Sequence, residues 1–291
     1  MFDQTHPLEI RPDIVNAIET TGLGIIEKPL SLPQRIADHG GVRKSLLLVV
    51  LAIIWECYAR WLDNPLLFPT FGATVEAWTA GVMSGQILVA TWMSVSVLLQ
   101  GYFAGLAIAA ILTAFATTTR VGSDLLETLT SMFNPLPSIA LLPLAMIWFG
   151  LGEGSIIFVL VHAVLWAVAL NTHSGFRSVS TTWRMVGKNY GLSSIRYVTQ
   201  ILIPGAFPSI LTGMKIGWAF AWRTLIAAEL VFGASSGSGG LGWYIFQNKN
   251  MLDIPNVFAG LLTVILFGLL VENLIFRNLE RRTIHRWGMQ S

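Results

Sequence analysis

Long apolar stretches with few polar interruptions dominate the chain after residue 44. Four ranges contain no Asp, Glu, Lys or Arg: 77–119, 128–152, 154–176 and 254–271. A helix of about 20 apolar residues crosses the roughly 30 Å hydrocarbon core of a bilayer. The pattern therefore predicts six membrane-spanning helices, near 45–62, 92–117, 126–149, 155–175, 208–232 and 256–277.

The third of these spans contains Pro135, Pro137 and Pro143, and proline removes a backbone donor from a helix. Carbonyls that are freed at membrane depth need protein or water as partners. We therefore expect this span to be kinked or broken where it borders the interior of the bundle. Asn134 and Ser138, beside the prolines, become candidates for lining a translocation pathway.

The composition supports a membrane protein and excludes several other classes. Hydrophobic residues make up 54% of the 291 residues, and charged residues make up 12%, about half the share of an ordinary soluble domain. A soluble enzyme, a nucleic-acid-binding domain and a disordered chain are therefore excluded. Cys57 is the single cysteine, so an intrachain disulfide is impossible.

The placement of Lys and Arg predicts the orientation of the chain. With a cytoplasmic N-terminus, nearly all cations outside the spans fall inside the cell, while Arg60 and Lys249 stay outside, as the positive-inside rule requires. The C-terminus is then cytoplasmic as well. We expect three parts: a polar N-terminal extension over 1–43, a membrane domain over 44–278, and a basic tail over 279–291.

One long internal loop, residues 176–206, separates the fourth and fifth spans on the cytoplasmic side. It mixes cations with Trp183, Tyr190 and Tyr197. This mixture is typical of a short surface helix that presents aromatic side chains to a protein partner. The alternative is a solvated basic loop that only fixes topology.

A motif in this loop resembles a known family. Gly191, nine further residues and then Ile201-Leu202-Ile203-Pro204 resemble the second half of the "EAA" motif in permease subunits of ABC importers. Where that motif begins Glu-Ala-Ala, this chain has Met185-Val186-Gly187, so the usual acidic residue is missing. The resemblance covers about residues 45–288 and is greatest to the nitrate, sulfonate and taurine branch. It continues through 136–144, 147–152, 205–213, 221–229, 236–242, Leu279-Glu280-Arg281-Arg282 and Trp287.

The resemblance implies an all-α polytopic bundle of about six transmembrane helices with a cytoplasmic coupling helix, as in type I ABC importer permeases. It further implies a multi-pass inner-membrane homodimer, a cytoplasmic ATPase dimer, and a periplasmic or lipid-anchored solute-binding protein that delivers a small anion. Membrane lipid would surround the dimer. The coupling residues would be Arg184, Met185, Gly187, Tyr190, Gly191, Leu192, Ile195 and Pro204.

ATP chemistry is expected on a partner rather than on this chain. The chain has no G-x4-G-K-[ST] phosphate loop, so ATP and Mg²⁺ belong to the ATPase, and the chain itself is not an enzyme. No set of His, Cys, Asp or Glu has a spacing typical of metal ligands. We therefore expect no cofactor, metal or nucleic acid on this chain.

Arg223 and Glu229 lie inside the fifth span, where charged residues often mark pathways. Six residues apart, they point about 120° apart around a helix, so a direct intrahelical ion pair is not expected. An arginine facing a central cavity would attract anions. Trp218 and Trp222, four residues apart, share one helix face. Each of the four is a candidate pathway residue, and structural packing is the alternative for each.

Three rival functions are weighed against this interpretation. An ion-coupled secondary transporter would need a repeat with a second broken span, which the sequence does not show. An intramembrane enzyme would rest on Gly233–Gly237, which formally matches G-x-S-x-G between membrane helices instead of on a strand-to-helix turn. A purely structural membrane scaffold is the third.

Overall fold

The computed structural model describes residues 40–232 and 239–285, without the side chains of residues 194, 195, 232, 284 and 285. The chain divides into two units, Met1–Ala52 and Ile53–Ser291. In the first unit, the described residues form the beginning of helix α2 (Gly40–Leu62), so the helix starts within the predicted N-terminal extension. The remainder of that extension lies outside the described residues.

Every regular element of the described ranges is a helix, which confirms the all-α prediction. In the second unit, α2 is followed by α3 (Phe71–Met83), α4 (Gln86–Thr118), α5 (Arg120–Phe133), η1 (Ser138–Leu141), α6 (Leu142–Phe149), α7 (Glu153–Ser178), α8 (Thr181–Asn189), α9 (Ser194–Tyr197), η2 (Val198–Leu202), α10 (Ile203–Phe232), α11 (Leu241–Asn250), α12 (Ile254–Val271), η3 (Glu272–Phe276), α13 (Arg277–Glu280) and η4 (Arg281–His285).

Four helical stretches are long and apolar enough to cross a membrane: 40–62, 86–118, 153–178 and 254–283. The pair formed by α5 and the segment 138–149 is apolar enough only when both halves are taken together, and they meet at an 87° bend, as in a broken span or a re-entrant loop. The predicted break at the prolines is therefore confirmed. Helix α10 occupies the place of the predicted fifth span with 30 residues but is not among these apolar stretches. It carries Lys215, Arg223 and Glu229.

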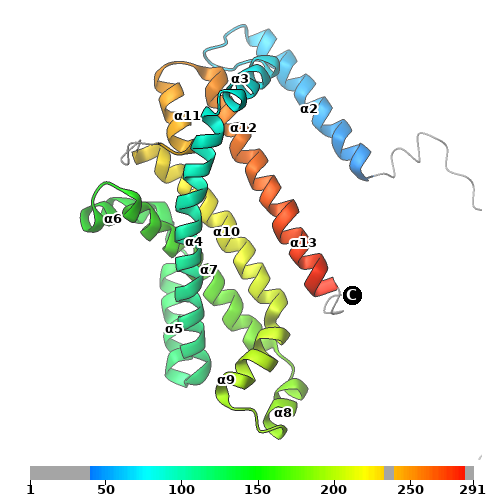
Figure 1. Ribbon diagram of the computed structural model, residues 1–291, viewed down its shortest axis with the longest axis vertical. Coiled ribbons are helices and arrows are strands. Elements are labelled where there is room, and N and C mark those ends of the chain that lie inside the picture. The colour runs from blue at the N-terminus through cyan, green and yellow to red at the C-terminus, as the bar shows by residue number, and fades with distance from the viewer. Residues whose placement is uncertain (1–39, 233–238, 286–291) are drawn as a thin grey trace, which may run out of the picture. The chain divides into compact units, whose positions relative to one another are not determined.

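Helix α7 forms the core of the second unit, packed along α4 on one side and α10 on the other (Figure 1). Glycine makes both contacts close. A Cβ atom on Gly101 would lie 2.5 Å from the Leu160 Cβ atom, and one on Gly213 would lie 2.8 Å from the Asn171 Cβ atom. Small residues let membrane helices approach until their backbones nearly touch, so van der Waals packing holds them together.

Within the second unit, short helices occupy opposite ends of the long ones. Figure 1 shows α8 and α9 at one end and α3 and α11 at the other. The sequence pattern did not predict α3 or α11, because each is shorter than a membrane span. The last membrane helix continues through Arg281–His285 without a break at residue 279, so the beginning of the predicted C-terminal tail is helical. Residues 286–291 lie outside the described residues.

Candidate functional site

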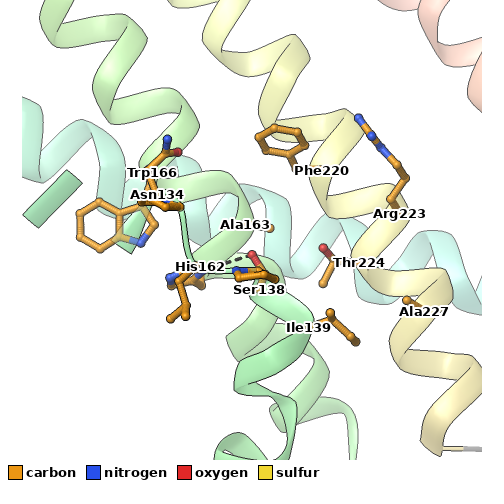
Figure 2. Close-up of a pocket in the computed structure, with 13 residues that line it drawn as sticks. Asn134, Ser138, Ile139, His162, Ala163, Trp166, Phe220, Arg223, Thr224 and Ala227 are labelled. Carbon is orange, nitrogen blue, oxygen red and sulfur yellow. Dashed lines mark hydrogen bonds between the residues drawn. The ribbon is translucent and has the colours of Figure 1, made fainter. Parts of the chain in front are cut away.

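A cavity of about 320 Å³ lies between the α5–η1 break, α7 and α10 (Figure 2). The break and α7 form one side of the cavity, and α10 forms the facing side. Thirteen residues line it: Asn134, Pro135, Leu136, Pro137, Ser138, Ile139, His162, Ala163, Trp166, Phe220, Arg223, Thr224 and Ala227. The cavity is therefore built where irregular backbone meets two long helices.

The break presents polar side chains because its prolines end α5 and start a new helix. The Ser138 hydroxyl lies 3.1 Å from His162 Nδ1, so α7 holds the start of η1 in place. Trp166 stacks on Phe133 with ring centroids 5.4 Å apart and fixes the end of α5. The Asn134 side chain forms no hydrogen bond within the described ranges, and it borders the cavity.

The α10 wall carries a cation without a counter-ion. Arg223 Nε donates to the Ala219 carbonyl at 3.1 Å, and its guanidinium carbon lies 5.4 Å from the centre of the Phe220 ring. No carboxylate of the described residues pairs with it. The Thr224 hydroxyl, one residue further, also has no hydrogen-bond partner among them. Arg223 is exposed at this wall, and a charged side chain within an apolar helix is rare, which favours a functional role.

Three of the six predicted pathway residues, Asn134, Ser138 and Arg223, come together at this cavity, and Trp218, Trp222 and Glu229 lie elsewhere. Trp222 is buried and donates from Nε1 to the Val264 carbonyl at 3.3 Å. Trp218 makes an edge contact with Tyr102 at 5.2 Å. Both tryptophans border a separate hollow between α10 and the last membrane helix, together with Arg223.

Glu229 lies 6% exposed in a polar network that joins three helices. Its carboxylate accepts hydrogen bonds from the Ser94 hydroxyl at 2.7 Å and from the Gly242 backbone N–H at 2.7 Å. The Ser94 oxygen in turn accepts from the Leu241 N–H at 2.7 Å. Together they accept hydrogen bonds from the first two N–H groups of α11, whose N-terminus favours a negative charge. As the spacing predicts, Glu229 does not pair with Arg223.

The predicted coupling segment folds as the short helix α8 with defined ends. The Ser180 hydroxyl accepts from the Trp183 N–H and caps the start. At the other end, Gly191 has φ +63°, the Leu192 N–H donates to the Gly187 carbonyl, and the Gly191 N–H donates to the Lys188 carbonyl. This pair of bonds is a Schellman motif, in which the left-handed position favours glycine. Gly191 therefore forms a tight turn at the end of α8.

Aromatic and apolar side chains of α8 and the turn point outward. Exposed fractions are 62% for Trp183, 57% for Met185 and 82% for Tyr190. Large exposed apolar side chains of this kind are typical of a protein-binding surface. The expected aromatic helix is thus present, with its apolar groups available to a partner.

Other predicted coupling residues have internal contacts. Arg184 points back to the C-terminus of α7, donating to the Val179 carbonyl at 3.1 Å and to the Phe176 carbonyl at 2.5 Å. Gly187 lies against the Tyr197 ring, where a Cβ atom would come within 2.9 Å. Pro204 lies in the first turn of α10, and Leu192 is half-buried. The side chain of Ile195 lies outside the described residues.

Sequence reasoning missed two polar residues that the structure gives a role. Thr224 completes the α10 wall, and Ser94 joins Glu229 to α11. A signal existed for Thr224, a hydroxyl beside a charged residue in an apolar span. No sequence signal linked Ser94 to Glu229, which lies 135 residues away.

Comparison with known proteins gives matches that span both the cavity and α8. Residues 101–285 match the family described as binding-protein-dependent transport system inner membrane component. The taurine transport system permease protein of Escherichia coli is 30% identical over 242 residues, 81% of this chain and 86% of that protein.

Two further relatives carry other names. An Escherichia coli permease named for aliphatic sulfonate transport is 28% identical over 82% of this chain and 89% of its own length. The nitrate import permease protein of Synechocystis is 26% identical over 80% of this chain and 86% of its own length. The three relatives are thus named for taurine, aliphatic sulfonates and nitrate.

Proposed function

This chain belongs to the family of binding-protein-dependent transport system inner membrane components, and from that membership we propose that it is the membrane-spanning subunit of an ATP-driven importer. The observation that carries the proposal is helix α8, a capped nine-residue helix that presents Trp183, Met185 and Tyr190 to solvent. A basic loop that only fixed topology would have no need of such a surface. Family membership also favours this function over ion-coupled secondary transport.

In the proposed assembly, two copies of this chain bind a dimer of a cytoplasmic ATPase, which carries ATP and Mg²⁺. A solute-binding protein delivers the solute to the outer face, and this chain holds no cofactor. The exposed apolar side chains of α6, such as Ile147 at 80% and Trp148 at 58%, are available to membrane lipid or to the second copy. The relatives' names support a small anion as the solute, of the taurine, sulfonate or nitrate kind.

The mechanical path runs from α8 into the two helices that border the cavity. Arg184 binds the last carbonyls of α7, and Gly187 lies against the segment that leads into α10. Closure of the ATPase dimer would push α8, and α7 and α10 would move with it. The cavity between them would then open alternately to the two sides of the membrane. Coupling thus uses apolar and aromatic contacts in place of the missing acidic residue of the motif.

The orientation that supports this assembly places α8 and both termini in the cytoplasm. The end of the second unit that carries α8 and α9 also carries Arg184, Lys188 and Arg196, as the positive-inside rule expects. A reporter enzyme fused after residue 190 should be active only in the cytoplasm. Activity of that fusion on the outer side would overturn the orientation and the coupling role of α8.

The experiment that tests the function is purification of the tagged chain from its native membrane under mild detergent. We expect a protein with a phosphate-loop motif to co-purify in equal amount, and the Trp183→Ala, Tyr190→Ala double variant to lose it. Proteoliposomes of the complex should take up a solute only when ATP is supplied. Uptake by the chain alone, driven by an ion gradient, would contradict the proposal.

A further inference from the structure

The loop that carries α8 has charges of one sign only. Residues 154–228 include no Asp or Glu, while the loop 176–206 within them contains four cations. No carboxylate of the loop can therefore neutralise these cations. A protein surface that meets the loop faces a positive field, which favours carboxylates on that surface and repels cations.

Two of the four cations of the loop have partners within this chain. Arg177 forms an ion pair with Glu127 of α5. Arg184 donates hydrogen bonds to the carbonyls of Val179 and Phe176 at the end of α7. Both guanidinium groups are therefore engaged inside the chain, where they hold the loop to α5 and α7.

The other two cations, Lys188 of α8 and Arg196 of α9, are exposed. Neither has an ion-pair partner in the part of the chain that the structure describes. Arg196 lies one residue before Tyr197, whose ring packs against Gly187 of α8. The two free cations therefore lie beside the helix that presents aromatic side chains to solvent.

Met185 lies on the outward side of α8. Gly187 is buried against Tyr197, and a helical residue two positions away points about 160° from it. Met185 accordingly faces away from the rest of the chain and is 57% exposed. It stands at the position of the acidic residue of the EAA motif. That position thus holds a flexible apolar side chain, which fits an apolar pocket and not a cationic one.

From these observations we propose that α8 and α9 select an ATPase whose docking groove is apolar where it receives Met185 and carries carboxylates at its rim, where it meets Lys188 and Arg196. The inference rests on the proposed function, because it names the chemistry of the partner which that function requires. A cation of the partner opposite residue 185 is excluded. The departure from the motif is therefore a determinant of specificity, which separates this pair of proteins from pairs that use the acidic residue.

An anionic membrane surface also attracts exposed aromatic and cationic side chains. Two observations favour the ATPase as the occupant. The chain belongs to a family of transport-system components, and Figure 1 shows α8 at one end of the second unit, where the long helices end. The lipid surface is therefore kept as an outcome of the test.

The first test restores the acidic residue of the motif. The tagged full chain in a nonionic detergent is titrated with the phosphate-loop protein that co-purifies with it. Met185→Glu is compared with Met185→Gln and Met185→Leu. Glutamate, glutamine and leucine form helices about as readily as methionine, so none of the three substitutions disturbs α8. A change in affinity therefore reports the partner's side of the contact.

We expect Met185→Leu to bind like the parent, Met185→Gln about tenfold more weakly and Met185→Glu about a hundredfold more weakly. The first loss comes from removing an apolar side chain from an apolar pocket, and the second from placing a carboxylate near carboxylates. A partner with a cation opposite residue 185 would instead bind Met185→Glu more tightly. An affinity of Met185→Glu equal to or above that of Met185→Gln would overturn the inference.

The second test detects the carboxylates of the partner directly. A water-soluble carbodiimide joins a lysine amine to a carboxylate in contact with it, so it should cross-link Lys188 to the bound ATPase, as mass spectrometry of the linked peptide can show. Lys188→Arg keeps the charge without this amine, and should keep the affinity and lose the cross-link. Lys188→Gln should weaken binding by about threefold to tenfold at low salt, and less at high salt. Lys249→Gln, which removes an exposed cation of α11, is the matched control and should change nothing.

Two results of the second test would overturn the inference. One is the absence of a linked peptide that contains Lys188, together with an affinity that Lys188→Gln leaves unchanged. The other is protection of Lys188 against acetylation in nanodiscs of anionic phosphatidylglycerol but not of phosphatidylcholine, again with unchanged affinity, which would assign the surface to lipid.

The design separates this inference from the proposed function. If no phosphate-loop protein co-purifies with the chain, the proposed function fails and the inference fails with it. If such a protein co-purifies and binds Met185→Glu as tightly as the parent, the proposed function stands and only the inference about the groove is wrong.

Discussion

The turn at Gly191 can test the proposed coupling surface. Its backbone angle disfavours any residue with a side chain, whereas the space around it would accommodate one. The φ angle of +63° is left-handed, yet a Cβ atom there would meet nothing within 4 Å. Any loss on substitution must therefore come from backbone strain and not from a clash. A left-handed conformation costs an ordinary residue about 1–2 kcal/mol, whereas asparagine adopts it more readily.

That cost predicts an order of effects that does not follow side-chain size. A strain of about 1–2 kcal/mol lowers the fraction of properly folded turn by up to about 5–30-fold. Gly191→Asn should retain most activity, Gly191→Ala should lose more although alanine is smaller, and the β-branched Gly191→Val should lose most. Gly72→Ala is the matched control, because Gly72 also faces open space but has no positive φ.

The assay measures the affinity of the detergent-purified chain for its ATPase, followed by ATP-dependent uptake in proteoliposomes. The amount of chain in the membrane should be the same for every variant, because the turn lies outside the membrane helices. If Gly191→Asn is as defective as Gly191→Val, or if Gly191→Ala is fully active, then the left-handed turn does not position the coupling surface.

Three further outcomes follow from described contacts. Tyr190→Ala removes an 82% exposed ring and should weaken ATPase binding by more than about 1 kcal/mol in a pull-down titration, while membrane insertion stays the same. An unchanged affinity would place the docking surface elsewhere. Glu229→Ala should lower the melting temperature of the purified chain, because the Gly242 N–H loses its acceptor at a cost of about 1–3 kcal/mol. A melting temperature equal to the parent's would show that the network does not stabilise the fold. Gly101→Ala should also lower the melting temperature, since the new methyl group would lie 2.5 Å from the Leu160 Cβ atom, whereas Gly72→Ala, where a Cβ atom meets nothing within 4 Å, should not; equal melting temperatures of the two variants would contradict the close α4–α7 contact.

Local chemistry made several features predictable from the sequence. The prolines of the third span correctly predicted a break, because a helix cannot keep its backbone hydrogen bonds through Pro135 and Pro137. The six-residue spacing of Arg223 and Glu229 ruled out their pairing. In each case the cause lies within one turn or two of helix, so a single stretch of sequence contains it.

Features that depend on packing between distant segments could not be predicted. Trp218 and Trp222 share a helix face, but the sequence does not indicate which neighbouring segment covers that face. In the structure, Trp218 contacts Tyr102 and Trp222 contacts Val264. Arg184 looked like a surface cation of the coupling segment, yet it folds back onto carbonyls of α7. The pattern of apolar residues reports that a side is buried, but it does not report against what.

The network around Glu229 ties three helices to two side chains. Ser94 of α4 and Glu229 of α10 hold the first turn of α11 through its Leu241 and Gly242 N–H groups. A substitution at Ser94 or Glu229 would therefore loosen α11 from its two neighbours although the sequence of α11 itself stays unchanged.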